Sequence, residues 1–417
     1  MMKKRCLFSI IVVIICTQLA FSSFFGSGAQ GYLIGQSSNI VKQTPTTPFD
    51  NIILMIGDGM SWGQINATKK WLGTPATLTM EELTYLGDIE TSSLNSPVTD
   101  SSAAATALAT GNRTDNGMVG MLPNGDLLLT ILEVAERLGK ATGLVTTSPI
   151  THGTPAAFSA HVPDRDNQYE IAQQQLVQGI EVLLGGGMRY YSSLLETAES
   201  LGYQIVQNRT AMNVGVNEDY LLGLFANEQM SYEYDRNTLI EPHISEMTNI
   251  ALQILDRDTD GFFLMVEGAL IDYASHSMNI NRTIGETIAF DEAIRVVFEY
   301  AQQTARTLLV VTGDHETGGL WVNMSAPTLE YHFSTTIHTA TPVPVFVYHN
   351  SAATLPTFTH HIDIGQYLFS IIGQETPPPI NPIMLGLAIT LIVVIIILAT
   401  ALGVHIRRKT TTPEENH

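Results

Sequence analysis

Short, nearly continuous apolar runs recur between residues 49 and 376, and they alternate with longer segments whose apolar residues follow a helical period. Continuous apolar runs are typical of strands that are covered on both faces of a sheet. The predicted strands are residues 52–56, 142–147, 181–184, 204–206, 262–266, 307–312 and 344–348. The predicted helices are residues 127–138, 165–178, 242–255 (with Pro242 in the first turn), 284–303 and 362–372. This alternation predicts one doubly wound α/β domain with a mostly parallel central sheet and helices on both faces.

An apolar segment near the start of the chain lies outside this alternation. Residues 7–25 are mostly apolar, follow the basic run at residues 3–5 and precede small residues. This three-part pattern is typical of a secretory signal peptide, with an uncleaved signal anchor as the alternative, and we assign it to residues 1–28. A stretch rich in Thr, Pro, Gln and Ser then predicts a linker at residues 29–48. The folded domain is expected to occupy residues 49–376.

A second apolar segment lies near the other end of the chain. Residues 383–404 are uncharged over about the length of a helix that spans a bilayer, and the basic run at residues 407–409 follows. Basic residues favour the cytoplasmic side, so residues 405–417 are expected to form a cytoplasmic tail. The Pro-rich residues 377–382 predict a stiff linker. The sequence therefore predicts a single-pass protein of the cell membrane whose folded domain lies outside the cell.

The charge balance limits what the folded domain can bind. The chain has 417 residues with 20 Lys plus Arg against 40 Asp plus Glu, and part of the basic set lies in the two terminal runs. A broad surface for nucleic acid or anionic lipid needs clustered basic residues, which the central chain lacks. An anionic ligand would therefore have to be bound by a few local cations.

Three of the predicted strands end in acidic residues. Asp58 follows the first strand, Glu267 follows residues 262–266, and Asp314 with His315 follows residues 307–312. Ligands of an α/β sheet bind at the carboxyl edge of its strands, and several carboxylates that meet there need cations to stay ionised. A single acidic residue after a strand is ordinarily a helix cap or a turn residue. Three such ends with attached histidines favour a metal centre instead.

Further histidines follow a spacing that is typical of metal ligands. Asp272 and His276 lie four residues apart, which places both on one face of a helical turn. His338 lies in the loop before the last predicted strand and is a candidate third ligand, although a loop histidine alone carries little information. Mixed sets of Asp and His suit zinc.

Two further segments carry candidate catalytic residues. Ser101 lies directly before an Ala-rich helix that is expected to end at Gly111. A serine there is ordinarily an N-cap, but the positive end of a helix also stabilises a nucleophilic alkoxide. Downstream of residues 152–157, Arg165 offers a planar guanidinium that can donate two parallel hydrogen bonds to a phosphoryl group.

These motifs together resemble the alkaline phosphatase family. The resemblance rests on residues 99–101 with the Ala-rich helix, residues 266–272 with His276, and residues 312–316, and it extends over residues 51–373. It implies that residues 49–376 form a catalytic domain of this family. It implies that Ser101 is the nucleophile that becomes phosphorylated and that Arg165 binds two phosphate oxygens.

The resemblance also implies three metal sites. One zinc would be held by Asp272, His276 and His338, and a second by Asp58, Asp314 and His315. Magnesium would be held by Asp58, Thr154 and Glu267. His152 and Tyr273 stand near this third site where the best-known bacterial pattern has aspartate and lysine, so His152 joins the candidate ligands and the identity of the third metal stays open.

Other departures from the family pattern concern the nucleophile and the assembly. Ser102 stands where the family usually has alanine, which makes it a rival nucleophile. The segment at residues 319–338 is short, so the insertion that helps many relatives to dimerise is reduced. A homodimer therefore stays an open expectation.

The expected function is metal-dependent hydrolysis of phosphate monoesters through a phosphoserine, with release of inorganic phosphate and an alcohol outside the cell. One alternative is a phosphodiesterase or sulfatase on the same fold, although the Cys/Ser-x-Pro-x-Arg signature of sulfatases is missing. A second alternative is a non-enzymatic binding protein of the cell surface. Against it, the nucleophile and the ligands are all present.

Overall fold

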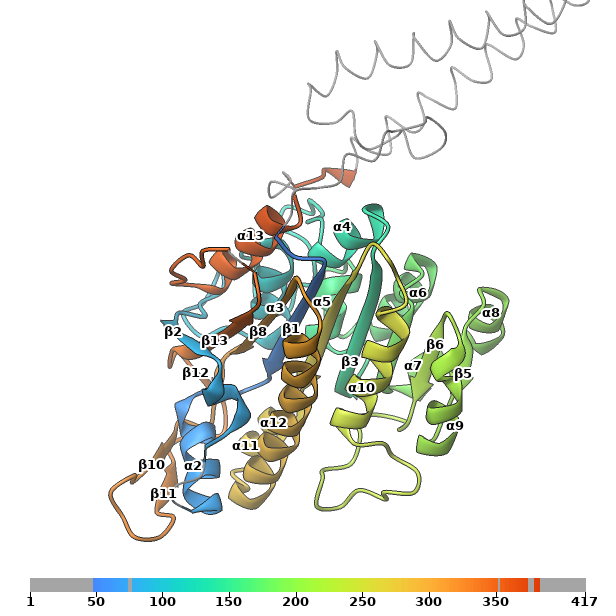
Figure 1. Cartoon of the computed structure of the whole chain (residues 1–417). Helices are drawn as coiled ribbons and strands as arrows, with labels where there is room; N and C mark the ends of the chain where they lie inside the picture. Colours follow the sequence, from blue (N-terminus) through green and yellow to red (C-terminus); the bar gives the residue numbers. More distant parts are fainter. Residues whose placement is uncertain (1–47, 74–76, 352, 374–378, 383–417) are drawn as a thin grey trace, which may run out of the picture. The chain divides into compact units, whose positions relative to one another are not determined.

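A nine-stranded sheet in the order β2-β13-β8-β1-β7-β3-β4-β6-β5 forms the centre of the computed structural model (Figure 1). The structure describes residues 48–73, 77–351, 353–373 and 379–382. The chain divides into two units, and the sheet lies wholly within the unit Pro45–Pro379. The nine strands are β1 Asn51–Gly57, β2 Thr84–Ile89, β3 Ala141–Pro149, β4 Val182–Gly186, β5 Gln204–Val206, β6 Leu221–Leu224, β7 Phe262–Gly268, β8 Thr307–Gly313 and β13 Val343–His349.

Most neighbouring strands run parallel. The strands from β8 to β5 in this order pair in parallel, whereas β13 is antiparallel to both β8 and β2. The short strands β9 Glu316–Thr317 with β12 His338–Thr339, and β10 Leu320–Val322 with β11 Tyr331–Phe333, form two small antiparallel sheets. The prediction of an α/β fold with a central, mostly parallel sheet is confirmed.

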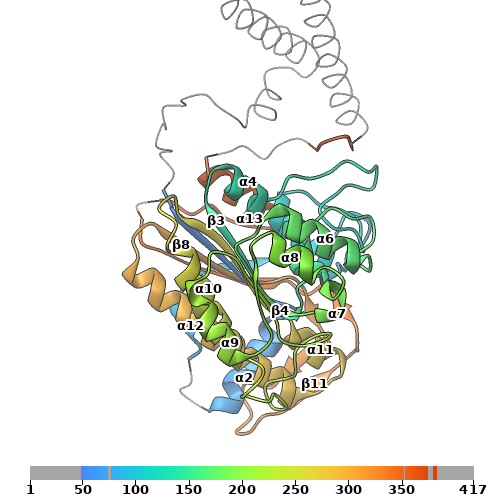
Figure 2. The same ribbon diagram turned by 90° about the vertical axis from the view of Figure 1, so that its right-hand side faces the viewer.

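Helices cover both faces of the central sheet (Figures 1 and 2). Ile52, Leu54 and Ile56 of β1 belong to one apolar cluster, whereas Ile53 and Met55 belong to another, because successive side chains point to opposite faces of a strand. The first cluster includes side chains of α3 Ser101–Thr110, α4 Ile131–Arg137, α5 Gly153–Ser159, α6 Gln168–Gln178 and α13 His361–Ile371. The second includes side chains of α2 Trp62–Leu72, α10 Ile244–Leu255, α11 Leu270–His276 and α12 Ile280–Gln303. The remaining helices, α7 Met188–Tyr191, α8 Leu195–Ser200 and α9 Arg209–Val214, are short.

Several helices begin at a different residue from the predicted one because local caps fix their starts. The helix predicted at 127–138 begins at Ile131, since Thr130 and Glu133 exchange hydrogen bonds in a capping box. The helix predicted from Arg165 begins at Gln168, after Asn167, and the backbone N–H of Arg165 donates to the carbonyl oxygen of Gly117.

Two other helix starts differ for the same reason. The helix predicted at 242–255 begins at Ile244 with His243 as its N-cap, so Pro242 precedes the helix rather than occupying its first turn. The helix predicted at 284–303 starts four residues earlier, where Asn279 accepts a hydrogen bond from the backbone of Arg282. Each cap satisfies a backbone donor that a helix start would otherwise leave free.

The parallel register brings the carboxyl ends of three central strands together. Gly57 at the end of β1 pairs with Gly268 of β7 and with Gly313 of β8. A side chain at Gly313 would put its Cβ only 2.1 Å from the carbonyl oxygen of Met60, so the loops that follow β1 and β8 pack too closely for any other residue. The acidic residues after these strands therefore converge on one edge of the sheet.

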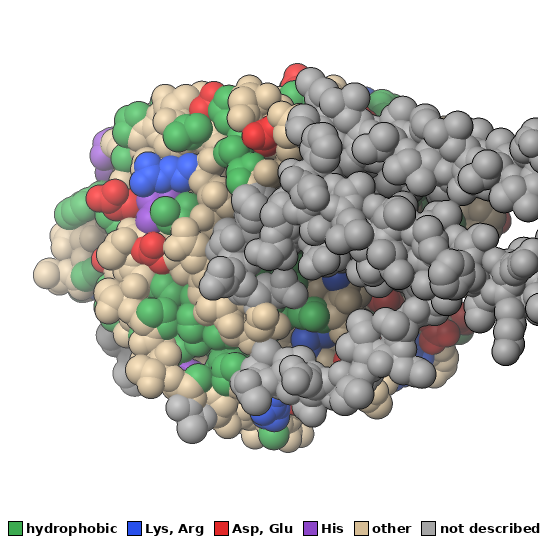
Figure 3. Space-filling model, turned by 90° about the horizontal axis from the view of Figure 1, so that it is seen from above, with side chains coloured by type: hydrophobic (Ala, Val, Ile, Leu, Met, Phe, Trp, Pro, Cys, Tyr) green, Lys and Arg blue, Asp and Glu red, His purple; other side chains and the backbone are tan. Residues whose placement is uncertain are grey.

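The structure describes none of the three predicted terminal segments, namely the signal, the transmembrane helix and the tail. Among residues 48–73, 77–351, 353–373 and 379–382, no helix combines the length and the apolar character needed to cross a bilayer. The predicted signal (1–28), transmembrane helix (383–404) and tail (405–417) lie outside the described residues. On the described part of the face in Figure 3, basic, acidic and apolar side chains are interspersed.

Candidate active site and metal centre

Asp58, Asp314 and His315 form a fully buried cluster at the ends of β1 and β8. Nε2 of His315 lies 3.5 Å from Asp58 Oδ1 and 3.3 Å from Asp314 Oδ2. Oδ1 of Asp314 accepts hydrogen bonds from the backbone N–H groups of Gly59 and His315, which fix its orientation. Both oxygens of Asp58 and Oδ2 of Asp314 are buried without a hydrogen-bond partner. Such oxygens fit a metal ion, because buried carboxylates otherwise require donors.

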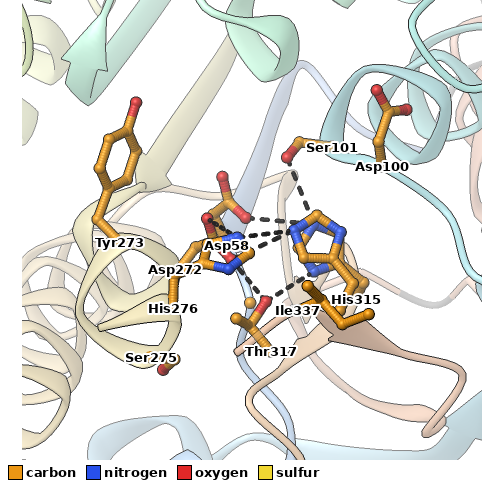
Figure 4. Close-up of polar contacts among 12 residues, drawn as sticks. Asp58, Asp100, Ser101, Asp272, Tyr273, Ser275, His276, His315, Thr317 and Ile337 are labelled. Carbon is orange, nitrogen blue, oxygen red and sulfur yellow. Dashed lines mark hydrogen bonds and ion pairs between the residues drawn. The ribbon is translucent and has the colours of Figure 1, made fainter. Parts of the chain in front are cut away.

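Asp272, His276 and His338 form a second cluster. Its members Asp272 and His276 lie beside Asp58 and His315 of the first (Figure 4). Asp272 and His276 lie on α11, as the spacing predicted, and Nε2 of His276 is 3.3 Å from Asp272 Oδ2. His338 enters from β12, with its Nε2 3.1 Å from Nε2 of His276. The ring of His338 also stacks on that of His315, with centroids 3.5 Å apart. The two clusters therefore adjoin.

The hydrogen bonds of His276 and His338 set their ring tautomers. Nδ1 of His276 lies 2.6 Å from the carbonyl oxygen of Thr336, and Nδ1 of His338 lies 2.9 Å from that of Thr99. Carbonyl oxygens only accept, so both Nδ1 atoms carry protons and both neutral Nε2 atoms present lone pairs to each other. Two such lone pairs at this distance fit a shared cation. Without a metal a proton takes that place, since the hydrogen bond with Asp272 raises the pKa of His276 to about 9.

A third cluster lies on the other side of Asp58. One ligand atom each of Asp58, His152 and Glu267 lies within 4.8 Å of the others. Oε2 of Glu267 accepts hydrogen bonds from Thr146 and Ser148, but its Oε1 has no partner. Oγ1 of Thr154 is also buried without a partner. The unpartnered oxygens of Asp58, Thr154 and Glu267 are the kind of metal ligand that magnesium prefers.

The carboxylates of this site cannot all be ionised in the absence of cations. Burial, and then the charges of Asp314, Asp272 and Glu267, raise the pKa of Asp58 well above its ordinary value. Burial likewise raises the pKa of Asp314. Metal ions would reverse both shifts by supplying positive charge. The raised pKa values of Asp58 and Asp314 and the unpartnered oxygens therefore both indicate a metal centre at this place.

Ser101 is the first residue of α3, and its hydroxyl faces the metal cluster. Asp100 is the N-cap and accepts a hydrogen bond from the backbone N–H of Ala103. Oγ of Ser101 lies 3.3 Å from Nε2 of His315, whereas the carboxylate of Asp100 points away (Figure 4). The hydroxyl of Ser102 donates to Asp100 instead. Of the two serines, only Ser101 presents its hydroxyl to the candidate zinc ligands.

Arg165 is held next to Ser101 by two partners. Its Nη1 donates to Asp100 Oδ2 at 2.9 Å, and its Nη2 lies 3.0 Å from Nε2 of His152. Burial alone would raise the pKa of Asp100, but Arg165 and the backbone of Ala103 lower it overall. The Arg165 side chain remains 20% exposed, so an anion can reach it. Asp100 and His152 thus fix the position of the guanidinium.

Thr317 and Asp100 contribute contacts to which the sequence assigned no role. Oγ1 of Thr317 donates to Asp272 Oδ1 at 2.5 Å and lies 3.2 Å from Nδ1 of His315, so it links the two zinc clusters. In the sequence, only its position two residues after His315 points to a role at the site. That role becomes clear in the structure, where β9, which carries Thr317, pairs with β12, which carries His338. Asp100 belongs to the motif at residues 99–101, but its contact with Arg165 spans 65 residues.

Comparisons with known proteins agree with this site. The sequence model of the alkaline phosphatase family matches residues 49–363. The chain is 35% identical over 354 residues to alkaline phosphatase 3 of Bacillus subtilis, which covers 81% of this chain and 75% of that protein. It resembles the solved structure of alkaline phosphatase from the Antarctic bacterium TAB5 with a TM-score of 0.72 and 30% identity, over 79% of this chain and 99% of that one.

A variant of the TAB5 enzyme, in which aspartate replaces a histidine, has Mg bound in a site designated M3. It matches with a TM-score of 0.73 and 29% identity, over 79% of this chain and 99% of that one. The resemblance that the sequence motifs predicted is therefore confirmed. By its sequence, its fold and its matched relatives, this chain belongs to the alkaline phosphatase family.

Proposed function

We propose that this chain hydrolyses phosphate monoesters through a phosphoserine on Ser101, outside the cell. The observation that carries the proposal is the 3.3 Å approach of Ser101 Oγ to His315 Nε2, beside carboxylate oxygens that lack partners. Membership of the alkaline phosphatase family supports the hydrolysis of phosphate monoesters. The identity of the nucleophile and the location of the reaction are part of the proposal.

The three clusters name the residues that would hold the metals. Zinc would be held by Asp272, His276 and His338 at one site and by Asp58, Asp314 and His315 at the other. Magnesium would be held by Asp58, Thr154 and Glu267. When bound, these ions supply Lewis-acid stabilisation of the charge on the attacking and leaving oxygens. Magnesium at the third site is supported by the TAB5 variant that binds Mg at M3.

The chain's own residues prepare both displacement steps. Ser101 Oγ gives up its proton to solvent and forms a bond to phosphorus, while the bond from phosphorus to the leaving oxygen breaks and that oxygen takes up a proton, so an alcohol departs. Water then attacks the phosphoserine, which releases inorganic phosphate and restores Ser101. Arg165 orients two phosphate oxygens throughout, and the N-terminal end of α3 favours negative charge at Ser101.

A single preparation tests the proposed reaction. The detergent-solubilised full chain, loaded with zinc and magnesium, should release phosphate from an aryl phosphate, lose this activity on chelation and regain it when both metals return. Elemental analysis of the same sample should show bound zinc. Bound zinc with no phosphate release would contradict the proposed reaction.

Replacing Arg165 by alanine is expected to weaken inhibition by inorganic phosphate by about 10- to 100-fold, the effect of losing a charge-assisted, two-point contact. Bound zinc should stay at the wild-type amount, because Arg165 bonds to Asp100 and His152 rather than to the zinc clusters. The matched control is Arg189→Ala, which removes a surface arginine paired with Glu228. Phosphate inhibition that is equal in the two variants would remove Arg165 from this role.

The location outside the cell is proposed from the terminal segments alone. Residues 1–28 would direct export, residues 383–404 would anchor the chain, and the domain at 49–376 would face outward. Intact cells should therefore hydrolyse an aryl phosphate that does not cross the membrane. A chain that ends at Thr376 should release this activity into the medium. Activity that emerges only after lysis would overturn the proposed location.

A further inference from the structure

The helix α13 begins with two adjacent histidines that make different contacts. His360 is the N-cap, and its Nδ1 accepts a hydrogen bond from the backbone N–H of Ile362. Asp363 completes the capping box by accepting from the backbone N–H of His360. His361 is the first residue of the helix and is completely buried. The two cap residues are thus His360 and Asp363, which leaves the ring of His361 outside the cap.

The ring of His361 donates to the carbonyl oxygen of Gly313. Its Nε2 lies 3.0 Å from that oxygen, and a carbonyl oxygen only accepts, so Nε2 carries the proton. Nδ1 of the same ring is buried without a hydrogen-bond partner, so it stays unprotonated. Burial lowers the pKa of His361 to about 3, and His360 adds a smaller effect in the same direction. The ring is therefore a neutral, fixed donor and not a group that titrates near neutral pH.

Gly313 joins strand β8 to the candidate zinc ligands Asp314 and His315. The antiparallel register of β13 on β8 ends one residue earlier, at Thr312. The carbonyl group that His361 holds belongs to the planar peptide between Gly313 and Asp314. The orientation of this peptide sets the direction in which the backbone of Asp314 leaves the strand.

A rotation of this peptide would displace both candidate ligands together. Oδ1 of Asp314 accepts from the backbone N–H groups of Gly59 and His315, so the carboxylate is tied to the residue that follows it. Its Oδ2 lies 3.3 Å from Nε2 of His315, and these two atoms would bind the same zinc ion. His361 thus restrains two candidate ligands through the backbone that carries them.

The same helix packs against α3, which begins with Ser101. A Cβ at Gly365 of α13 would lie 2.6 Å from the carbonyl oxygen of Ala107 and from the backbone nitrogen of Gly111, so only glycine permits this approach. Gln366 then donates to the carbonyl oxygen of Gly111 at 3.1 Å. Through its first turn α13 holds the end of β8, and through its second it holds the helix of the candidate nucleophile.

We propose that α13 is a positioning element of the active site, in which His361 sets the orientation of the two candidate zinc ligands through the carbonyl group of Gly313. The consequence for turnover rests on the proposed function, whereas the consequence for zinc affinity follows from the contacts alone. Segments that are distant in the sequence supply Ser101 and these ligands, and α13 contacts both segments. Loss of the donor on His361 therefore weakens zinc binding and slows phosphoryl transfer while every ligand is kept.

The test compares His361→Leu with His361→Gln in the detergent-solubilised full chain. Leucine fills a similar volume but donates nothing, whereas glutamine carries a donor about as far along the side chain as Nε2. The zinc dissociation constant, measured by competition with a chelator, should rise about tenfold in His361→Leu, as when a group that supports a metal ligand is lost. In His361→Gln it should stay within about threefold of the wild type. Wild-type zinc affinity in the leucine variant, or a glutamine variant as weak as the leucine one, would overturn the proposal.

Turnover at saturating zinc gives a second readout. At equal zinc content by elemental analysis, His361→Leu should hydrolyse an aryl phosphate about tenfold more slowly than the wild type, because a small displacement of the reacting groups costs rate. Glutamine should restore the rate, and full turnover in the leucine variant would contradict the positioning role. A wild-type chain that binds zinc without turnover would count against the proposed function only, since the comparison of zinc affinities needs no reaction.

The matched control is His360→Ala, which removes the cap of the same helix and keeps the contact with Gly313. It should melt at a lower temperature, while its zinc dissociation constant stays within about twofold of the wild type. If the leucine variant does not fold, His361→Asn replaces it, because its amide reaches only as far as Nδ1. A loss of zinc affinity in His360→Ala as large as in His361→Leu would assign the effect to helix stability and contradict the role of His361.

Discussion

Replacing Ser101 by alanine is expected to lower the turnover of an aryl phosphate by at least about 10³-fold, the scale on which removal of a catalytic nucleophile acts. The variant should also form no phosphoenzyme, because among the residues that the structure describes no other hydroxyl is hydrogen-bonded to Nε2 of His315. Zinc should stay bound, since the ligands of both clusters are unchanged. Steady-state rates, trapping of labelled phosphoenzyme and elemental analysis check the three expectations.

Ser102→Ala is the matched control for this experiment. Ser102 is adjacent and equally buried, but its hydroxyl donates to Asp100 at 2.9 Å rather than facing the zinc clusters. Its removal should cost about tenfold at most, through a less constrained Asp100. Loss of phosphoenzyme in Ser102→Ala, with normal levels in Ser101→Ala, would identify Ser102 as the nucleophile instead.

Replacing Asp58 by asparagine is expected to lower activity about as strongly as Ser101→Ala does. In the metal-free protein, the same substitution is expected to raise the melting temperature. Asp58 belongs to both the cluster with Asp314 and His315 and the cluster with His152 and Glu267. Its loss should empty the second zinc site and the third site together and lower turnover by at least about 10³-fold. Metal content and steady-state rates measure these two effects.

After chelation, Asp58→Asn should melt at a higher temperature than the wild type. Burial, followed by the charges of Asp314 and Asp272, raises the pKa of Asp58 in the folded protein well above its ordinary value of 3.8. A carboxyl group with a raised folded pKa stabilises the fold at low pH, and this contribution is lost as pH rises through that pKa. The chelated wild type should therefore melt lower at pH 8 than at pH 5.

Asparagine removes the share of that pH dependence that comes from Asp58, because it has no proton to lose. Asp314 still contributes, as do Glu136 and Glu286, whose pKa values burial raises to about 8. The surface control is Asp219→Asn, whose side chain is 91% exposed in the wild type. It should change neither metal content nor the pH dependence of melting. A chelated Asp58→Asn protein that melts below the chelated wild type at pH 8 would contradict the repulsion argument.

The sequence predicted the elements and residues whose signals are local. Continuous apolar runs located the central strands, and because parallel strands end at one edge, Asp58, Glu267 and Asp314 were expected to converge there. The spacing of Asp272 and His276 likewise predicted their common helical face. Comparison with named phosphatases supports an enzyme over the alternative of a non-enzymatic surface protein.

Features that depend on distant contacts could not be read from the sequence. The edge strand β2 is half exposed and lacks an apolar run, so it was not predicted. The buried strand β6 was not predicted either, although the shorter strand β5 was. The role of Thr317 depends on Asp272, 45 residues away. The contact between His152 and Arg165 depends on the turn at Gly153, where a side chain would collide with the guanidinium. The motifs in the sequence do not reveal this turn.

The hydroxyl of Thr317 has a consequence for the order in which the site fills. It donates to Asp272 of one zinc cluster and lies within hydrogen-bond distance of Nδ1 of His315 in the other. A hydroxyl that donates to Asp272 can only accept from His315, so Nδ1 of His315 carries the proton and its Nε2 keeps the lone pair that a metal would need. One hydroxyl thus orients ligands of both clusters, and we expect occupation of one zinc site to favour that of the other, so that half-loaded molecules are scarce when zinc is limiting.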